Sequence, residues 1–362
     1  MTADTLKTSM VTPNPINIYQ KKINRELDIF FNSLKKRYHN LDYTRIFIKS
    51  MEDFSKRGGK RLRPILMIQG YNLFKPENHE IIRTSISIEL IHNFLLVHDD
   101  VMDRDILRRG GLTINKLYSN YFKSSFNNSS DTHLGNATAI TIGNIFCSLG
   151  NAVIGNSSFP EKNKCEALNA ISEIITNVGI GQCYDIMYSR KEDLTEKELL
   201  IMYNLKTAVY SFSGPLVLGA TLAGASKTSI KKIESFSKPL GLAFQIKDDL
   251  LDLYGTESML GKPVGSDFRE AKKTLLLTTM LKLATPKERK EILIFLGNKK
   301  LNKRDIKRLK KIGVESGAFD YCNSLSDRLI NEATVILRKS SYNKKGVKIL
   351  LQIADYIQKR EL

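Results

Sequence analysis

The sequence predicts an all-α protein, and three observations support this fold class. Apolar residues recur at spacings of three and four along nearly the whole chain, which is the period of an amphipathic helix. The chain contains no alternating segments joined by Asn-Gly or Asp-Gly, the pattern typical of β-hairpins. Helix-start signals are also present, because Thr195 and Thr285 are each followed three positions later by a glutamate, as in a capping box.

Individual helices follow from this periodicity together with capping residues, prolines and glycines. Pro286 suits the first turn of the helix that Thr285 opens, and Gly297 suits the position just beyond its end. The stretch 123–135 is polar and rich in Asn and Ser, which predicts a surface loop between two helices. In chain order, the predicted helices cover 16–37, 43–56, 60–74, 78–104, 136–155, 162–189, 196–212, 215–225, 228–254, 271–284, 286–296, 303–317, 319–339 and 343–360.

Length and composition place the chain among globular proteins. Its 362 residues are 42% hydrophobic and 26% charged, which supplies a large core and excludes disordered and collagen-like classes. At about 150 residues per domain, the length alone would suggest two domains. We recognise no secretory signal, no transit peptide and no run of about 18 apolar residues, so we expect a soluble cytoplasmic protein.

The cysteines predict neither a disulfide framework nor a zinc site. They are widely spaced and form no C-x-x-C pair, and a reducing compartment fits them best. The four are Cys147, Cys165, Cys183 and Cys322.

The charge balance suggests a polyanionic partner. The formal net charge is +18 and the pI is about 9.6. Basic clusters run over 299–311 and 338–348, but no aromatic residues are interleaved with them to stack on bases, so we expect no nucleic-acid partner. Solvated helix faces are the simpler interpretation of both clusters. A weak attraction to anionic lipid headgroups stays open.

Two acidic motifs of the form D-D-x-x-D carry the main chemical signal. Each ends an apolar helix, where unpaired carboxylates would be costly without cations nearby. Two such motifs suggest facing acid arrays around hard cations, and Mg²⁺ prefers oxygen ligands that substrate phosphates complete. We therefore expect a diphosphate substrate. The motifs are Asp99, Asp100 and Asp103, and Asp248, Asp249 and Asp252.

Basic turns follow both acidic motifs and also precede the first. Any one of them is more often an ordinary charged turn, but their number around two metal-type clusters favours phosphate binding. Helix entrances add backbone amides and a dipole that attract anions. The turns contain Lys60 and Arg63, Arg108 and Arg109, Lys262, and Lys272 and Lys273.

These motifs make the chain resemble the trans-isoprenyl diphosphate synthases, most closely the short-chain geranylgeranyl type. The resemblance runs from GGKRLRP through LIHNFLLVHDDVMDRDILRRGG, GIGQCYDI and LAFQIKDDLLDLYG to GKPVGSDFREAKKT and ADYIQKREL. It implies one all-α domain of ten or more helices around a deep central cavity, in a homodimer. We therefore assign residues 16–362 to this domain and residues 1–15 to a flexible N-terminus.

The resemblance also implies roles for individual residues. The six motif aspartates would hold Mg²⁺ on the allylic diphosphate. Positions that match the isopentenyl diphosphate site are Lys60, Arg63, His92 and Arg109. Positions that match the allylic diphosphate site or its mouth are Arg108, Lys206, Gln245, Lys262 and Lys272, of which Lys206 and Lys262 are also expected to act in catalysis. Gln182 and Asp185 align with a family motif, and Asp185 could meet either a metal-bound water or a basic partner.

The expected reaction is a head-to-tail condensation of isopentenyl diphosphate with an allylic diphosphate. Diphosphate leaves the allylic substrate, the double bond of isopentenyl diphosphate attacks the cation, and a proton is lost. Helix projection from Asp99 places Leu95 and Ile91 along the path of the growing chain, with Phe94 beside them. A bulky residue before a smaller one at Phe94 and Leu95 resembles the geranylgeranyl pattern, so we expect a C20 product.

Two features depart from the family pattern, and several alternatives stay open. An asparagine follows Gly143 where an aspartate is common, and Ile114-Asn115 stand where a histidine or aromatic residue is common. Neither position is an expected metal ligand. The alternatives are a farnesyl or longer-chain synthase, a class I terpene cyclase, which would leave Lys60, Arg63 and Arg109 idle, and a non-catalytic subunit of a heteromeric synthase, which would typically lack some of the six acids.

Overall fold

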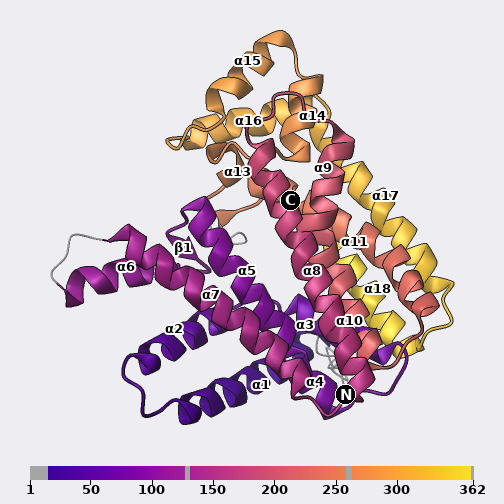
Figure 1. Ribbon diagram of the computed structural model, residues 1–362. Coiled ribbons are helices and arrows are strands. Elements are labelled where there is room, and N and C mark those ends of the chain that lie inside the picture. Colours follow the sequence, from indigo (N-terminus) through magenta and orange to yellow (C-terminus); the bar gives the residue numbers. More distant parts are fainter. Residues whose placement is uncertain (1–14, 127–130, 258–262, 360–362) are drawn as a thin grey trace, which may run out of the picture.

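A computed structural model describes residues 15–126, 131–257 and 263–359, and helices make up most of this part (Figure 1). The only strands within it are β1, Leu107–Arg108, and β2, Gly111–Leu112, which pair as a short antiparallel hairpin. The predicted fold class is confirmed, and the described residues form more than ten helices. The N-terminal segment 1–14 and Lys262 lie outside the described residues.

The N-terminal half contains the helices that carry the first acidic motif. Its helices are α1 Pro15–Arg37, α2 Thr44–Lys56, α3 Leu62–Asn72, α4 His79–Thr84, α5 Ile86–Asp103, α6 Ile114–Ser125, α7 Thr132–Gly155 and α8 Glu161–Tyr188. The C-terminal half carries the second motif on a helix of 28 residues, α11. Its helices are α9 Glu196–Tyr203, the π-helix η1 Asn204–Ser213, α10 Gly214–Leu222, α11 Lys227–Tyr254, α13 Ser266–Arg269, α14 Leu275–Leu283, α15 Pro286–Phe295, α16 Lys303–Glu315, α17 Ala318–Arg338 and α18 Lys344–Gln358.

The predicted loop over 123–135 is wrong at both ends. Helix α6 was not predicted and continues to Ser125, with Ile114 and Tyr118 buried four positions apart on one face. Helix α7 begins at Thr132 rather than at 136, because the Asp131 carboxylate caps it by accepting a hydrogen bond from the Leu134 amide at 3.0 Å. The Asn and Ser content of this stretch predicted a loop. Tertiary packing, rather than local composition, determines where the two helices end and begin.

Other boundaries differ less. The predicted helix 78–104 divides at Ser85 into α4 and α5, and the predicted helix 196–212 consists of α9 and the π-helix η1. The capping boxes at Thr195 and Thr285 are present, with Pro286 in the first turn. Gly297 follows α15 with φ +78°, as its position beyond the helix end predicted.

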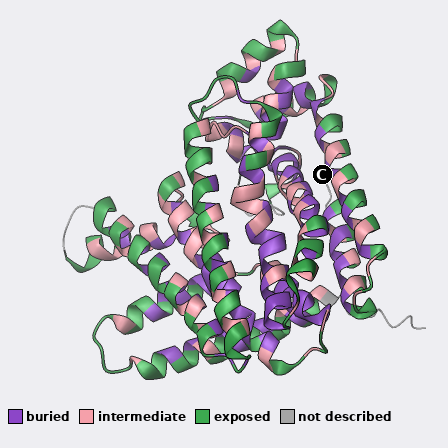
Figure 2. Ribbon diagram, turned by 45° about the vertical axis from the view of Figure 1, so that its right-hand side comes forward, coloured by how far each residue is buried: buried purple, intermediate pink, exposed green. Residues whose placement is uncertain are grey.

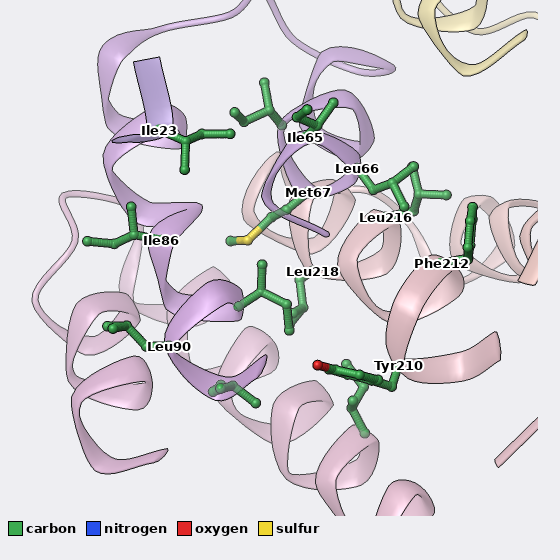
Figure 3. Packing of buried hydrophobic residues seen from close by; sticks show 14 of the residues in the cluster. Ile23, Ile65, Leu66, Met67, Ile86, Leu90, Tyr210, Phe212, Leu216 and Leu218 are labelled. Atoms are coloured by element: carbon green, nitrogen blue, oxygen red, sulfur yellow. The ribbon is translucent and has the colours of Figure 1, made fainter. Parts of the chain in front are cut away.

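Buried apolar side chains form two clusters. The larger joins α1–α5 to α7, α8, α10 and parts of η1, α11, α17 and α18, and Figure 3 shows its centre, where Met67 of α3 lies near Leu218 of α10. The smaller joins α9 and the end of α11 to α13–α16 and the start of α17, which form the upper part of the molecule in Figure 1. Figure 2 shows buried residues concentrated on the inner helices and exposed ones on the outer surfaces.

Helices α3 and α10 touch through glycines, which brings the two sides of the site together. A Cβ on Gly219 would lie 1.9 Å from the Met67 carbonyl oxygen, and a Cβ on Gly70 would lie 2.1 Å from the Leu216 carbonyl oxygen. Both obstacles are backbone atoms, so no side-chain movement could relieve them. This contact fixes Arg63 of α3 beside Ser211 of η1, which precedes α10.

Candidate active site

The first acidic motif lies at the C-terminal end of α5, and basic side chains surround it. The buried Asp100 accepts a hydrogen bond from Arg108 Nε at 2.6 Å. Arg108 Nη2 lies 3.5 Å from Asp99, and Lys272 Nζ lies 2.8 Å from Asp103. Burial raises the pKa of Asp100 to about 7 although Arg108 opposes the shift. Burial also acts on Asp103, but the Lys272 ammonium outweighs it and lowers the pKa of that carboxyl.

The β-hairpin after α5 directs two arginines to different partners. Arg108 ends β1 and faces the acids, whereas Arg109 has a left-handed backbone with φ +51° and its side chain lies near Gly59. Gly110 follows with φ +74°, a conformation that side chains disfavour. The Arg-Arg-Gly-Gly sequence thus forms a turn that sends neighbouring cations to two sides of the site.

The second motif lies near the end of α11, and its three acids differ in their surroundings. Asp248 lines a cavity of about 820 Å³. Asp249 is buried, accepting hydrogen bonds from the Tyr203 hydroxyl and from Gln245 Nε2, the latter at 2.8 Å. Burial, with the negative charge of Asp267 nearby, raises the pKa of Asp249 well above its ordinary value.

The Asp252 carboxylate accepts hydrogen bonds from other residues of the protein. Its two carboxylate oxygens accept hydrogen bonds from Ser266 Oγ at 2.5 Å and from the Asp267 amide at 3.0 Å, and its main-chain oxygen accepts from the Gly265 amide at 2.7 Å. The third acid of the second motif therefore anchors the segment that leads into α13. It is also one of the residues that line the cavity.

A second cluster of basic side chains surrounds His92. Arg63 Nη1 and Arg109 Nη2 lie 3.2 and 3.3 Å from His92 Nε2, and the Tyr210 hydroxyl meets His92 Nδ1. Burial, helped by Arg63 and Arg109, lowers the pKa of His92 well below its usual value. Because guanidinium groups only donate, Nε2 of the neutral ring accepts, and Nδ1 carries the proton toward Tyr210.

This cluster has unused donors that suit an anion. Arg63 Nε and Arg109 Nη1 are buried and have no hydrogen-bond partner among the described residues. The Arg63 guanidinium also lies 4.3 Å from the centre of the Tyr210 ring. Lys60 is more exposed, and its ammonium meets the hydroxyl and ring of Tyr356 near the C-terminus.

Acids and lysines from both motifs and their surroundings line a polar cavity, and Arg63 and His92 line an adjoining apolar one. The polar cavity has a volume of about 820 Å³ and the apolar one about 410 Å³. Both are lined by Asp99, Lys206, Thr207, Gln245 and Asp248, so the acids stand where the two meet. Lys206 itself lies 2.5 Å from Asp185 and 4.0 Å from Asp99, which gives Asp185 a basic partner.

The structure brings most of the predicted site residues together, with Lys262 outside the described residues and Ile91 elsewhere. Phe94 and Leu95 line the apolar cavity. Ile91 is fully buried and lines neither cavity; its Cγ1 would lie 2.7 Å from a Cβ on Gly150 of α7. The helix projection assumed that the cavity runs along α5 from Asp99 past Ile91. At Ile91, however, α7 packs against α5 and fills this space.

Two tyrosines and a π-helix were missed by the sequence analysis. Tyr203 joins Asp249 to the Leu275 amide, and Tyr210 joins His92 to Arg63. Both partners lie far away in sequence, so spacing gives no signal for them. Tyr210 belongs to the π-helix η1, a rare element that is frequent at functional sites and that also carries Lys206.

Comparison with known proteins identifies the family. The polyprenyl synthetase family model matches residues 44–312. The geranylgeranyl diphosphate synthases of Saccharolobus solfataricus and Sulfolobus acidocaldarius are 31% and 32% identical, covering 93% and 91% of this chain and 99% and 95% of their own lengths.

A solved structure agrees with this. A geranylgeranyl pyrophosphate synthase from Corynebacterium glutamicum, complexed with isoprenyl diphosphate and magnesium, has the same fold with a TM-score of 0.89 at 23% identity, covering 95% of this chain and 99% of its own. The chain therefore belongs to the polyprenyl synthetase family and is a prenyltransferase of the trans-isoprenyl diphosphate synthase class.

Proposed function

We propose that the protein condenses isopentenyl diphosphate with allylic diphosphates in a Mg²⁺-dependent reaction and releases geranylgeranyl diphosphate. One observation carries the proposal: two cation clusters flank a row of carboxylates at the point where a polar cavity opens into an apolar one. This arrangement suits two diphosphates side by side with a hydrocarbon tail beyond them. The similarity to the two geranylgeranyl diphosphate synthases supports the same reaction.

The donor set of the cavity fits Mg²⁺. Within the described ranges, no three acids, histidines or cysteines stand close enough to form a complete metal site on their own. This suits Mg²⁺, which usually takes one or two carboxylates and completes its shell with substrate phosphates and water. Asp99 and Asp103 of α5 and Asp248 and Asp249 of α11 would hold it, and bound there it would neutralise charge on the leaving diphosphate.

Different basic side chains of the chain bind the two substrates. The isopentenyl diphosphate is bound by Arg63, Arg109 and Lys60. Arg63 Nε and Arg109 Nη1, which have no hydrogen-bond partner among the described residues, donate hydrogen bonds to its oxygens. Neutral His92 adds no charge but holds both guanidinium groups in place. On the other side, Lys206 faces the allylic diphosphate beside Asp99.

The apolar cavity protects the reacting carbon. The C–O bond of the allylic substrate breaks with its electron pair going to diphosphate, the double bond of isopentenyl diphosphate attacks the cation, and a proton leaves for the departing diphosphate. Phe94, Leu95 and Phe244 exclude water from this cation and receive the growing tail. Phe94 is a bulky residue in the wall of this cavity of about 410 Å³, which supports a C20 product.

We expect the exposed apolar face of α7 to bind a second copy of the chain. This helix has no charged residue except for the titratable His133, although a quarter of the whole chain is charged. Ile140 and Ile145 are 45% and 39% exposed on it. By length and composition α7 could also cross a membrane, but a third of that apolar window is buried inside the protein. A homodimer through this face covers it, and the four free cysteines fit the reducing cytoplasm.

The experiment is a condensation assay with the purified full chain. Mg²⁺, labelled isopentenyl diphosphate and one of three allylic starters, of five, ten or fifteen carbons, are supplied, and dephosphorylated products are separated by chromatography. We expect a C20 alcohol as the main product and no turnover when a chelator removes Mg²⁺. Cyclised hydrocarbon formed without isopentenyl diphosphate would indicate a terpene cyclase, and no condensation at all would indicate a non-catalytic subunit.

A further inference from the structure

The upper end of the molecule carries a concentration of positive charge that the reaction does not use. We call residues 286–315, which form α15, the following turn and α16, the basic lobe. It contains eleven Lys and Arg residues and four Asp and Glu residues, a net charge of +7 out of +18 for the whole chain. Figure 1 shows α15 as the outermost element at the end opposite α1.

The acids of the basic lobe are already engaged within it. Glu288, Glu291 and Glu315 all lie within 4 Å of Arg308, and Asp305 caps the start of α16. Of the exposed basic side chains, Lys311 lies 3.5 Å from Glu315, whereas the others make no ion pair in the described part of the chain. The exposed cations without an ion pair are Lys287, Arg289, Lys290, Lys299, Lys300, Lys303, Arg304 and Lys307. The outer surface is therefore almost purely cationic.

Two large apolar side chains stand among these cations. Ile294 is 71% exposed and Leu293 is 54% exposed, one turn beyond Arg289 and Lys290 on α15. A helix that presents apolar residues between lysines and arginines is typical of segments that lie in the interface of an anionic membrane. Nucleic-acid surfaces would favour aromatic or polar residues between the cations, and the exposed surface of this lobe has isoleucine and leucine there.

The basic lobe is attached directly to the wall of the polar cavity, which Asp252 and Asp267 line. Ser266 and Asp267 of α13 bind Asp252, and the next residue, Phe268, accepts a hydrogen bond from the Gly297 amide at 2.8 Å. Arg269 Nη2 donates to the Leu301 carbonyl at 3.2 Å. One short helix thus separates the second acidic motif from the cationic turn.

We propose that the basic lobe docks on the anionic surface of a lipid bilayer, with Leu293 and Ile294 entering the headgroup layer. The polar cavity then lies close to the membrane, and an amphipathic prenyl diphosphate leaves the enzyme near the phase that its tail prefers. This last consequence rests on the proposed function, whereas the docking itself does not.

The test uses the full chain and sedimentation with vesicles. Vesicles of phosphatidylcholine alone are compared with vesicles that also contain phosphatidylglycerol, at low and high salt. We expect binding to the anionic vesicles only, lost at high salt because screening weakens the attraction. Replacing Lys290, Lys299, Lys300 and Lys303 together by Gln should lower the affinity at least about a hundredfold, since each cation near an anionic surface contributes roughly fivefold.

A matched variant controls for total charge. Lys339, Lys344, Lys345 and Lys348 are equally exposed but lie at the other end of α17, a helix of 21 residues, about 31 Å long. Their joint replacement by Gln should leave vesicle binding close to that of the unchanged protein. Equal loss in both variants, or no binding by the unchanged chain at low salt, overturns the proposal.

Two further readouts separate the mechanism from its rivals. Leu293→Ser with Ile294→Ser keeps every charge and should weaken vesicle binding several-fold; unchanged binding overturns the insertion of these residues. A competing single-stranded oligonucleotide should not displace the vesicles, and preferential binding to it overturns the lipid assignment. Condensation without vesicles should be normal in all variants, so a failure of docking is distinguishable from a failure of the proposed function.

Discussion

At the scale of single residues, the six motif aspartates are chemically equal in sequence but not in the folded protein. Asp99 and Asp248 line both cavities, whereas Asp252 accepts hydrogen bonds from Ser266 and Asp267 with both carboxylate oxygens. The sequence predicts all six as metal ligands because nothing local distinguishes them. The difference arises from a segment fourteen and fifteen positions later that folds back onto Asp252.

This difference gives the first prediction. Asp99→Ala and Asp248→Asn should lower kcat by at least about a hundredfold, because both side chains line the two cavities that would hold the reacting groups. Asp252→Asn should lower the free energy of unfolding by about 1–3 kcal/mol. The Asp252 carboxylate accepts from both Ser266 and Asp267, and the NH₂ group of an asparagine could not accept in place of one of its oxygens. Urea unfolding and steady-state kinetics check both. An unchanged free energy of unfolding in the Asp252 variant would contradict the anchoring role.

The second prediction separates the two substrate sites. Lys60→Ala should raise the KM for isopentenyl diphosphate by about 10- to 100-fold, which corresponds to the loss of one charge-assisted contact of about 1.5–3 kcal/mol, and should leave the KM for the allylic substrate nearly unchanged. Lys206→Ala should show the opposite pattern. Initial rates with each substrate varied in turn measure this. Parallel changes in both constants for both variants would contradict the division of the cavity.

How far the site could be predicted depends on the range of its contacts. The acids and the basic turns stand next to one another in sequence, so spacing identifies them. Tyr203 and Tyr210 reach Asp249 and His92 only through the fold, 46 and 118 positions away, and no local pattern marks them. Ile91 is the converse case, because its spacing from Asp99 is suitable but α7 fills the space beside it.

At the scale of elements, helix periods were predicted well and helix contacts were not. Amphipathic spacing indicates that α3 and α10 are helices, but only the structure shows that Gly70 and Gly219 let their backbones touch. The missed helix α6 and the early start of α7 have the same origin, since the polar 123–135 stretch is locally loop-like while Ile114 and Tyr118 are buried. Propensity decides an element only where packing does not.

The third prediction concerns the wall that α5 gives to the apolar cavity. Phe94→Ala removes an aromatic ring from this wall and should lengthen the products beyond C20, whereas Leu95→Phe adds volume closer to the acids and should shorten them toward C15. Chromatography of the dephosphorylated products measures the distribution. Ile91→Val, a change on the same helix at a residue that lines neither cavity, serves as the control and should leave product length unaltered.

Identical products from the unchanged chain and both cavity variants would contradict this wall as the limit on length. The Phe94 ring lies edge-on to His98 at 4.7 Å, and His98 Nε2 lies 3.1 Å from the Ile140 carbonyl of α7. The limit would then belong to α7 rather than to α5.

At the scale of the whole molecule, one surface lacks the solvent-facing charge that the rest of the chain has in excess. The outward side of α7 presents Ile140, Thr141, Asn144 and Ile145, and no Asp, Glu, Lys or Arg occurs anywhere in this helix of 24 residues. A monomer with a net charge of +18 would not be expected to leave such a face in water. The proposed dimer covers it and keeps the charged surfaces outside.

The last prediction tests that dimer. Ile145→Lys introduces a charge that must be desolvated when two copies meet, and near a twofold axis it lies close to its own counterpart, so the protein should become largely monomeric. Val335→Lys on α17 is the control, because Val335 is 49% exposed but lies among charged residues, and this variant should stay dimeric. Light scattering after size exclusion gives the mass of each. A monomeric unchanged protein, or a dimeric Ile145 variant, would remove α7 as the contact surface.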